Sequence, residues 1–517
     1  MRRDRLTLAA AAALLALFAG LSAWEMSGDS LTADERVHLP AGYAYWTARE
    51  FRLNPEHPPL VKLLCAAPLL PMRLVLPSLQ PDPGKSWRSF QSWFGTRFLF
   101  SQRRNVGSIL LRGRVVALLI GIALLVLLFQ WSRELHGHAG AGLVTLLLAA
   151  LEPTLLAHGH YVTDDVGLAC FSVMAMFFLW RLGRTGRRRD LALASIGMGL
   201  ALATKFSATI LLPPFFYFLW RRLPGGDPRR VRIAALLGAA LAMAAIVQAS
   251  YLFSPDLGLY FKGLAALKAN RPEVNPAYIH GRFFKDMVVW YPLYAWLLKT
   301  PLPTLAVLGV AAFSAARRGR RRAPEGLPLV LAPAALLLLA VCLLAYNYGV
   351  RYLIPVTSFL LVFAGGAYHV LGASWRGRLI AAALGAWLAA SVAHASPHYI
   401  GYFNELVGGP ANGLYYLQDS NIDWGQDLKR LARYQEENRI PELALGYWGP
   451  GQPEYYGIRW RPWTFEETVS DPPPPGVYAA SVNDLIALKR RVATEGADPH
   501  LDWLILVYRF PPRPAPP

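Results

Sequence analysis

Long apolar runs recur along this chain of 517 residues, and they constrain its fold more than any other feature. A run of about 17 to 25 apolar residues can cross the hydrocarbon core of a bilayer as a helix. Charged residues make up only 16% of the sequence, against roughly 25% in soluble domains. We therefore predict an all-α polytopic membrane protein. Its expected spans, about eleven, lie near residues 7–24, 107–129, 139–157, 165–181, 191–204, 206–220, 232–253, 301–316, 327–345, 353–371 and 378–396.

Arginine clusters between these runs predict the orientation. They read "RLGRTGRRRD" from 181, "RRLPGGDPRRVR" from 221, "RRGRRR" from 317 and "WRGR" from 375. Cytoplasmic loops are rich in Lys and Arg, so we place the N-terminus and all four clusters in the cytoplasm. The net charge of +19 then reflects orientation, and we expect no nucleic-acid partner. Since many spans follow it, the first run is expected to remain as an uncleaved anchor.

The fifth and sixth runs share the stretch "GMGLALATKFSATILLPPFF", in which Lys205 separates two half-length apolar segments. If both segments cross the membrane, Lys205 lies near its outer face. A single long span with a lysine inside the membrane is the alternative. That alternative would invert the orientation of everything downstream, against the pattern of the arginine clusters.

Two domains follow from this topology. Residues 1–396 form a transmembrane core whose first outer loop spans 25–106, and residues 397–517 form an extracytoplasmic tail. The tail carries a helical pattern in "DWGQDLKRLARYQEEN" and strand-like runs in "ELALGYWG", "GVYAASV" and "WLILVY". About 120 residues are enough for one small domain, so we predict a compact α/β unit there.

An acidic pair, Asp34 and Glu35, lies in the first outer loop within "ADERVHLPAGYAYW". Thr32 and Glu35 have the spacing of a capping box, in which the two side chains satisfy the first free N–H groups of a helix. Asp34 in the first turn also suits the helix dipole. Structural and catalytic roles are both open for this pair. Pro40 is expected to end or restart the helix.

The same loop continues with "NPEHPPLVKLL", in which Glu56 and His57 precede two prolines. Both residue types bind divalent metals, but adjacent side chains diverge. A metal site there would therefore need ligands from elsewhere, for which the candidates are His158, His160 and His280. Ordinary surface hydrogen bonds are the alternative role for the pair.

Further polar residues are predicted on the same outer side. Asp164 and Asp165 follow Thr163 in the short turn before the fourth run. The structural expectation is that Thr163 caps a helix and that the aspartates lie in its first turn. Lys205 and Arg351 are cations near that face, and both could extend to lipid headgroups. Carboxylates and fixed cations beside lipid are also what sugar transfer from a lipid phosphate requires.

The motif pair "DERVHLPAGYAYW" and "HPPLVKLL" resembles the protein O-mannosyltransferase family and its bacterial relatives, glycosyltransferase family 39. The aspartate-bearing turn and "RYLIP" at 351 look similar too. "DSNIDWGQDLKRL" in the tail resembles the C-terminal region of bacterial lipid-carrier-dependent glycosyltransferases. The tail does not look like the β-trefoil inserts of the eukaryotic members.

The resemblance implies a GT-C fold, a polyprenyl-phosphate-linked sugar as donor, and inversion at the anomeric carbon. It implies Asp34 as general base, with Glu35 beside it in the catalytic pair. It further implies a donor-phosphate and substrate site and, from Glu56 and His57, a possible divalent metal ion. The residues expected in the donor-phosphate site are His57, Lys62, Asp164, Asp165, Lys205 and Arg351.

We therefore expect a glycosyltransferase of the bacterial inner membrane that transfers a hexose or pentose, in the manner of a mannosyltransferase, to an extracytoplasmic acceptor hydroxyl. Protein, lipid and polysaccharide all remain open as the acceptor. The main alternative is a transporter or flippase for a lipid-linked saccharide, which would concentrate its essential charges within the spans. A third possibility is a scaffold with a membrane anchor and a binding tail.

Overall fold

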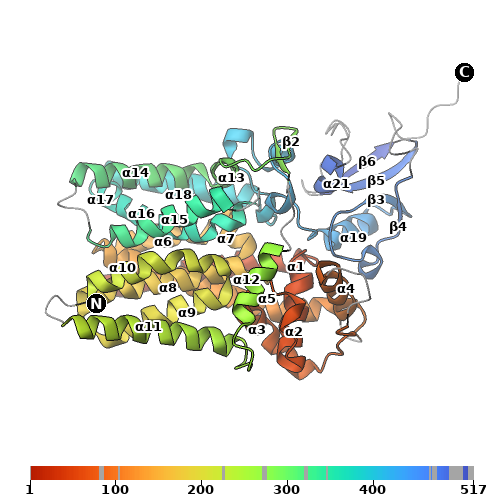
Figure 1. Ribbon diagram of the computed structural model, residues 1–517. Helices are drawn as coiled ribbons and strands as arrows, with labels where there is room; N and C mark the ends of the chain where they lie inside the picture. The colour runs from red at the N-terminus through yellow and green to blue at the C-terminus, as the bar shows by residue number, and fades with distance from the viewer. Residues whose placement is uncertain are drawn as a thin grey trace, which may run out of the picture.

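Helices account for most of the chain (Figure 1). The computed structural model describes residues 2–80, 87–102, 105–223, 228–269, 276–319, 324–344, 347, 349–464, 467, 474–487 and 505–510. Parts of the arginine-rich segments that begin at 221 and 317 lie outside these described residues.

Each of the eleven expected apolar runs overlaps one helix or a series of consecutive helices, and residue 345 of the ninth run lies outside the described residues. The corresponding elements are α1 (Arg2–Gly28), α5 (Val106–Leu135), α6 (Ala139–Ala150) with α7 (Pro153–His158), α8 (Asp164–Thr185), α9 (Arg188–Thr204), η3 (Phe206–Leu211) with α10 (Leu212–Arg222), α11 (Arg229–Ser250), α14 (Leu302–Arg318), α15 (Leu327–Leu344), η4 (Val350–Leu353) with α16 (Ile354–Ala364), η5 (Gly365–Ala367) and α17 (Tyr368–Leu371), and α18 (Trp375–His394).

Seven spans among the described helices are long and apolar enough to cross a membrane on their own. They are 4–28, 106–135, 164–185, 229–250, 327–344, 350–371 and 375–394. An eighth is possible if α13 (Tyr291–Lys299) and α14, which meet at 108°, form one broken span. The chain is thus a multi-span membrane protein, while the count of eleven stays a prediction because helices such as α6, with 12 residues, are shorter.

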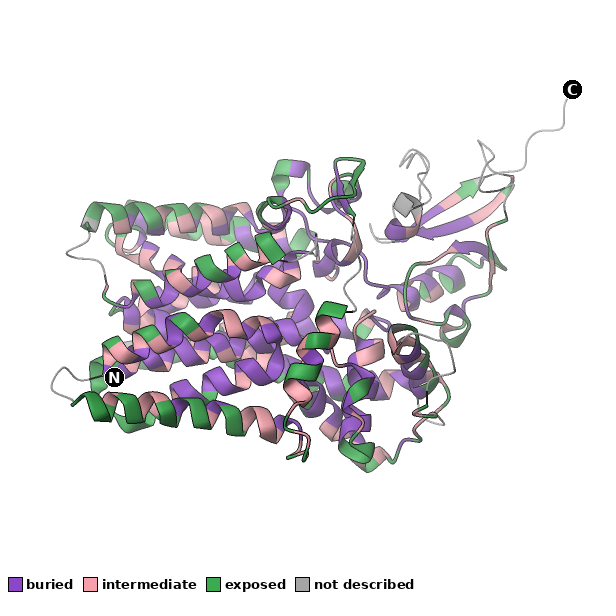
Figure 2. Cartoon of the chain, viewed as in Figure 1, coloured by how far each residue is buried: buried purple, intermediate pink, exposed green. Residues whose placement is uncertain are grey.

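The outermost helices expose apolar side chains where a soluble protein would place polar ones. Leu241 of α11 is 71% exposed, and Leu379 and Ile380 of α18 are 60% and 53% exposed. Figure 2 shows the buried residues in the interior of the bundle and the exposed ones along its outer helices. This distribution fits helices surrounded by lipid.

Residues 25–106, the expected first outer loop, contain helices that form a cap at one end of the bundle (Figure 1). Its elements are α2 (Glu35–Ala48), η1 (Phe51–Leu53), α3 (Leu60–Ala66), η2 (Ala67–Met72) and α4 (Trp87–Phe100). The expectation that Pro40 ends or restarts the helix is wrong, because α2 continues through it. Gly95 of α4 packs against the carbonyl of Arg36, the group that would have bonded an N–H at residue 40. A Cβ at residue 95 would lie 1.9 Å from that oxygen.

The tail lies at the same end of the bundle as this helical cap (Figure 1). It contains α19 (Leu428–Glu437), α21 (Val482–Ala487) and a four-stranded sheet of order β4-β3-β5-β6. The strands are β3 (Leu443–Gly446), β4 (Trp460–Pro462), β5 (Gly476–Ser481) and β6 (Ile505–Phe510). Strand β3 is parallel to β4 and β5, and β6 is antiparallel to β5.

The small α/β unit predicted for the tail is confirmed. Helix α19 and strands β3 and β5 lie within the segments expected from the sequence, β6 begins in the expected "WLILVY" and extends two residues beyond it, and β4 is an additional strand. Leu428, Leu443 and Val507 belong to a hydrophobic cluster made only of tail residues. Before the tail, residues 254–300 form α12 (Leu259–Ala269) and a hairpin of β1 (Ala277–Ile279) and β2 (Arg282–Phe284) in addition to α13.

Candidate active site

Lys205 lies at a break between two helices, as the sequence predicts. Helix α9 ends at Thr204, Lys205 has extended backbone angles (φ −148°, ψ 136°), and η3 begins at Phe206. The Lys205 ammonium lies 2.5 Å from a carboxylate oxygen of Asp165, in the first turn of α8. The break therefore directs a cation to the end of the bundle at which α8 begins.

Arg351 connects this pair to the first outer loop. Its Nη1 atom lies 2.5 Å from Asp34 Oδ2 and 3.6 Å from Asp165 Oδ2. Arg351 is part of η4, the first turn of the helical segment that continues as α16. Four residues that are far apart in the sequence, Asp34, Asp165, Lys205 and Arg351, thus form one ion-pair network.

Asp34 is the most accessible carboxylate of this network. Its side chain is 24% exposed, whereas that of Asp165 is 2% exposed. Burial alone would raise the pKa of Asp34, but the charges of Arg351 and His38 outweigh that effect and lower it. Asp34 is therefore ionised at neutral pH and can accept both hydrogen bonds and protons.

Residues of the tail pack against one side of this ion-pair network. The Trp424 ring lies 4.4 Å from the Arg351 guanidinium carbon, in the geometry of a cation–π contact. The Trp424 carbonyl accepts a hydrogen bond from Ala33 N, directly before Asp34. Asn421 Oδ1 accepts from Val350 N, directly before Arg351. One tail loop therefore holds the backbone on both sides of the Asp34–Arg351 ion pair.

His38, His57 and Asp164 form a group beside the network that could hold a metal ion. One ligand atom from each residue lies within 4.8 Å of the others. Among the described residues, His57 Nδ1 and both carboxylate oxygens of Asp164 have no hydrogen-bond partner. Burial lowers the pKa of His57 well below its usual value. Its ring is thus neutral, which is the form that binds metals.

The other proposed metal ligands lie elsewhere. Glu56 accepts hydrogen bonds from the side-chain amides of Asn54 and Gln91, so it does not join His57 in the metal group. His160 bonds to Asp29, and His158 packs against the Trp424 ring. His280 lies against the ring of Tyr416.

The surroundings of Glu35 indicate a structural role. Both of its carboxylate oxygens accept hydrogen bonds from Arg114, each at 2.7 Å, and the residue is fully buried. Thr32 donates to Glu35 through its backbone N–H and its hydroxyl, which is half of the expected capping box. Glu35 thus fixes the start of α2 and is not positioned as a second catalytic carboxylate.

Lys62 and Thr163 also differ from expectation. The ammonium of Lys62 donates to the carbonyls of Asn54 and His57, each at 2.7 Å, and is fully buried. Lys62 therefore fixes the 54–57 loop. Thr163 precedes α8, but its side chain makes no capping hydrogen bond. Asp164 and Asp165 occupy the first turn of that helix, as predicted.

Three site residues were missed in the sequence analysis: His38, Asn421 and Trp424. His38 lies one helical turn after Asp34, a spacing that places both side chains on one face of a helix. The four-residue spacing could have identified His38 as a neighbour of Asp34 if a helix had been assumed over these residues. Asn421 and Trp424 reach the site through tail packing, and nothing in their local sequence predicts that contact.

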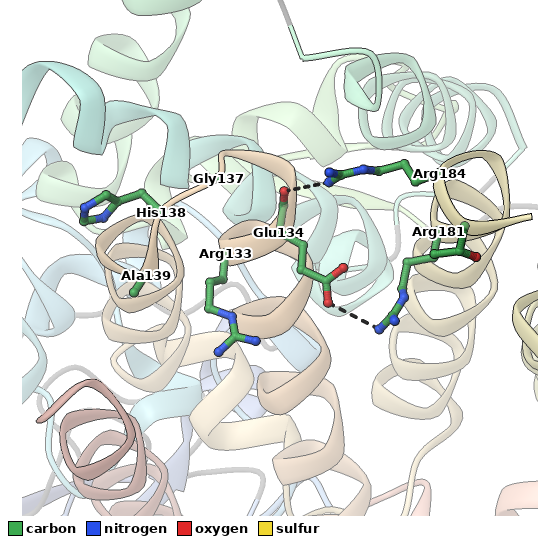
Figure 3. A pocket seen from close by; sticks show the side chains of 8 residues that line it. Arg133, Glu134, Gly137, His138, Ala139, Arg181 and Arg184 are labelled. Carbon is green, nitrogen blue, oxygen red and sulfur yellow. Dashed lines mark hydrogen bonds and ion pairs between the residues drawn. The ribbon is translucent and has the colours of Figure 1, made fainter. Parts of the chain in front are cut away.

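A second polar cluster lies at the far end of α8. There Arg133, Glu134, His138, Arg181 and Arg184 line an open pocket of about 440 Å³ (Figure 3). Arg181 pairs with the Glu134 carboxylate at 3.3 Å, and Arg184 donates to the Glu134 carbonyl. The 22 residues of α8 span about 33 Å at 1.5 Å per residue, which is close to the thickness of a bilayer. The acidic site and this arginine-rich pocket therefore lie at opposite ends of a membrane-spanning helix.

Comparisons with known proteins agree with this architecture. Residues 106–251 match the family described as dolichyl-phosphate-mannose-protein mannosyltransferase. A comparison with curated proteins finds no match. The crystal structure of ArnT from Cupriavidus metallidurans in the apo state is 14% identical, covers 98% of both chains and has a TM-score of 0.53. The fold is thus that of ArnT, and the GT-C fold expected from the resemblance is confirmed.

Two further structures are similar at lower scores. ArnT from Cupriavidus metallidurans bound to undecaprenyl phosphate is 15% identical, with a TM-score of 0.49 over 97% of both chains. The apo oligosaccharyltransferase from Archaeoglobus fulgidus is 12% identical, with a TM-score of 0.43 over 87% of this chain and 64% of the other. The family match begins at residue 106, so it does not include Asp34.

Proposed function

We propose that this protein is a glycosyltransferase that moves a sugar from a polyprenyl-phosphate carrier to an acceptor hydroxyl, with inversion at the anomeric carbon. The main support for this proposal is the ion-pair network in which Arg351 and Lys205 lie beside the accessible carboxylate of Asp34. The matched family supports the class of donor, because its description names a dolichyl-phosphate-linked sugar. The ArnT fold supports the same class of enzyme.

The proposed reaction is a single displacement. Asp34 accepts the proton of the acceptor hydroxyl. At the same time the hydroxyl oxygen of the acceptor forms the new bond to the anomeric carbon. The bond from that carbon to the phosphate oxygen breaks, and the electron pair leaves with the carrier phosphate. A general base typically contributes about 10²–10⁴-fold.

The cations have the complementary role. The leaving phosphate gains negative charge as the bond breaks, and Arg351 and Lys205 are fixed groups that can stabilise it. Arg351 offers a planar fork of donors that suits phosphate oxygens. On donor binding, the phosphate replaces Asp34 as the partner of Arg351, which frees the carboxylate to act as a base.

The group of His38, His57 and Asp164 suits a divalent cation, since imidazole and carboxylate are both common ligands. Asp34, Asp164 and Asp165 give this region three carboxylates against the two cations Arg351 and Lys205. A bound divalent ion would add positive charge where an anionic donor phosphate has to bind. We therefore propose metal binding by these three residues, with Glu56 outside the group.

Asp34→Asn tests the function. In lipid nanodiscs with radiolabelled polyprenyl-phosphate sugars, we expect this variant to fold and to transfer sugar about 10²–10⁴-fold more slowly. Asp256→Asn is a matched control, because Asp256 is an outer-side acid whose partner is the exposed Lys262. An undiminished rate in folded Asp34→Asn would show that Asp34 is not the base.

Metal content provides an independent test. Purified protein should retain about one equivalent of divalent ion per chain by mass spectrometry, and both His57→Ala and Asp164→Asn should lose most of it. Glu56→Gln should keep it. Equal metal content in all four proteins would contradict the proposed ligand set.

Charge placement in the unbroken spans argues against a transporter. In the seven candidate spans, no charged side chain lies in the middle third of the helix. Transporters concentrate essential charges near the bilayer midplane. With the arginine-rich pocket of Figure 3 in the cytoplasm, the active site and the tail face the extracytoplasmic side, which in bacteria is the outer side of the inner membrane.

A further inference from the structure

The tail domain contains a cavity that the proposed reaction does not use. Its volume is about 470 Å³, within the range of roughly 300–1,000 Å³ for small-molecule sites. Residues around its wall include Gly446, Tyr447, Trp460, Trp463 and Asp484. Three aromatic rings and one carboxylate thus surround a space large enough for a small polar molecule.

The cavity occurs where sheet topology predicts a binding site. The chain runs from β3 to β4 on one side of β3, and then crosses to β5 on the other side. In open sheets with parallel strands, ligands bind outside the carboxyl ends of the strands at such a reversal. Tyr447 directly follows β3, Trp463 directly follows β4, and Asp484 lies three residues after β5.

The aromatic walls are held rigidly. Tyr447 OH donates to the Gly425 carbonyl at 2.8 Å, and the Trp460 indole N–H donates to Glu454 at 2.8 Å. The Trp463 indole N–H donates to the Ala444 carbonyl at 2.9 Å. Since the polar atom of each ring is already bonded to the protein, each ring offers mainly its apolar surface to a ligand.

Gly446 leaves room for the carboxylate of Asp484. A Cβ at residue 446 would lie 2.1 Å from Asp484 Oδ2, so any other side chain there would displace the carboxylate. Apolar ring faces together with one carboxylate suit a sugar, whose C–H face packs on aromatic rings while its hydroxyls donate to the acid. A carboxylate disfavours anionic ligands, which excludes the donor phosphate as the natural occupant.

The cavity is connected to the candidate active site through a short segment. Tyr447 holds the Gly425 carbonyl, and the neighbouring residue, Trp424, stacks on Arg351. The segment that lines one side of the catalytic ion pair is therefore anchored by a wall of the tail cavity. An occupant of the cavity is thus positioned on the same side of the membrane as Asp34.

We propose that the tail cavity binds a neutral saccharide and, resting on the proposed function, that this saccharide is part of the acceptor. The tail domain then selects a glycan acceptor rather than a bare lipid or peptide hydroxyl. Binding of a saccharide does not depend on catalysis, so the two proposals can fail separately.

Saturation-transfer NMR and calorimetry on the full-length protein in nanodiscs test this inference. The probes are methyl glycosides of hexoses, pentoses and N-acetylhexosamines, together with short oligosaccharides built from them. We expect at least one to bind, and Asp484→Asn and Trp463→Ala to weaken its affinity at least tenfold. Trp463→Phe should restore most of the affinity, because it keeps the aromatic face.

Trp448→Ala is the matched control, because Trp448 is 38% exposed, is adjacent to Tyr447 and does not line the cavity. It should bind saccharide normally, and so should Asp34→Asn even though it fails to transfer sugar. Absence of binding by every probe, or equal affinity in Asp484→Asn, would overturn the saccharide site. Tighter binding of a lysine amide or of tetramethylammonium than of any sugar would overturn it in favour of a cation site.

Discussion

Replacing Arg351 by glutamine tests the electrostatic part of the proposed mechanism. The substitution keeps much of the side-chain volume but removes the charge that lies 2.5 Å from Asp34 and 3.6 Å from Asp165. The Arg351 side chain is only 12% exposed, so water cannot fully replace it. Both the leaving phosphate and Asp34 should respond to the loss.

The expected loss of rate follows from the geometry. A charge about 4 Å from the guanidinium interacts with it by about 4 kcal/mol at an effective dielectric constant of about 20. That energy corresponds to about 10³ in rate, and removal of comparable preorganised donors costs about 10²–10³ in kcat. We expect Arg351→Gln to lose about 10²–10³ in kcat. Arg351→Lys should lose less, because it keeps the charge without the fork.

The pH profile gives a second readout with a defined sign. The charged and titratable groups near Asp34 include Arg351, His38, Lys205, Arg36, Tyr352, Asp165 and Asp419. Among the charges that lower the pKa of Asp34, that of Arg351 is the strongest. Without Arg351 the pKa of Asp34 rises. Since a general base works in its ionised form, the acid limb of kcat/KM should move to higher pH in Arg351→Gln.

The assay is transfer from a polyprenyl-phosphate sugar in nanodiscs between about pH 4 and pH 8, with thermal unfolding to confirm the fold. Arg52→Gln is the control, because Arg52 pairs with Glu50 in the same outer loop and its side chain is 62% exposed. An acid limb at the same pH in wild type and folded Arg351→Gln would refute Asp34 as the titrating base. A kcat within threefold of wild type would refute the role of Arg351.

Three further predictions concern buried groups. Glu35→Gln breaks the buried ion pair with Arg114 and should lower the free energy of unfolding by about 3–5 kcal/mol. The rate of sugar transfer per folded molecule should stay within about threefold of wild type, and a large loss of that rate would indicate a catalytic role for Glu35. Lys62→Met should lower the unfolding temperature by several degrees, because two loop carbonyls lose their donor; an unchanged temperature would contradict its structural role. Burial raises the pKa of Asp423 to about 8, so the folded protein keeps a proton that the unfolded chain loses above about pH 4, and stability falls as pH rises towards 8. Asp423→Asn removes this dependence, and its advantage in unfolding temperature over wild type should grow between pH 5 and pH 8.

The membrane architecture could be predicted from sequence because it depends on local composition. Apolar length determines each span, and Lys205 marked a real break because a charge is costly inside an apolar helix. Pro40 misled the prediction because the helix tolerates it, with Gly95 packed against the carbonyl that it leaves unpaired. A local rule for proline cannot foresee a partner from another helix.

The candidate site could be predicted only in part. Asp34, Asp165, Lys205 and Arg351 were all expected on one face, and the structure brings them into one network. The sequence could not separate Asp34 from Glu35, because their different roles depend on which one faces Arg114. The metal ligands differ from the prediction for the same reason. The sequence predicts Glu56 with His57, whereas the structure places His38 and Asp164 beside His57 through tertiary packing.

The hydrogen bonds from Ser30 and Ala33 to the carbonyls of Gln426 and Trp424 join the beginning of the chain to its last hundred residues. During synthesis the N-terminal segment enters the membrane first and waits for nearly four hundred residues before its partner emerges. Asp34, the proposed base, is thus held in place only after the tail has folded against the N-terminal segment. A chain that ends before the tail would insert into the bilayer without the contacts that hold Asp34, so the proposed active site is completed last.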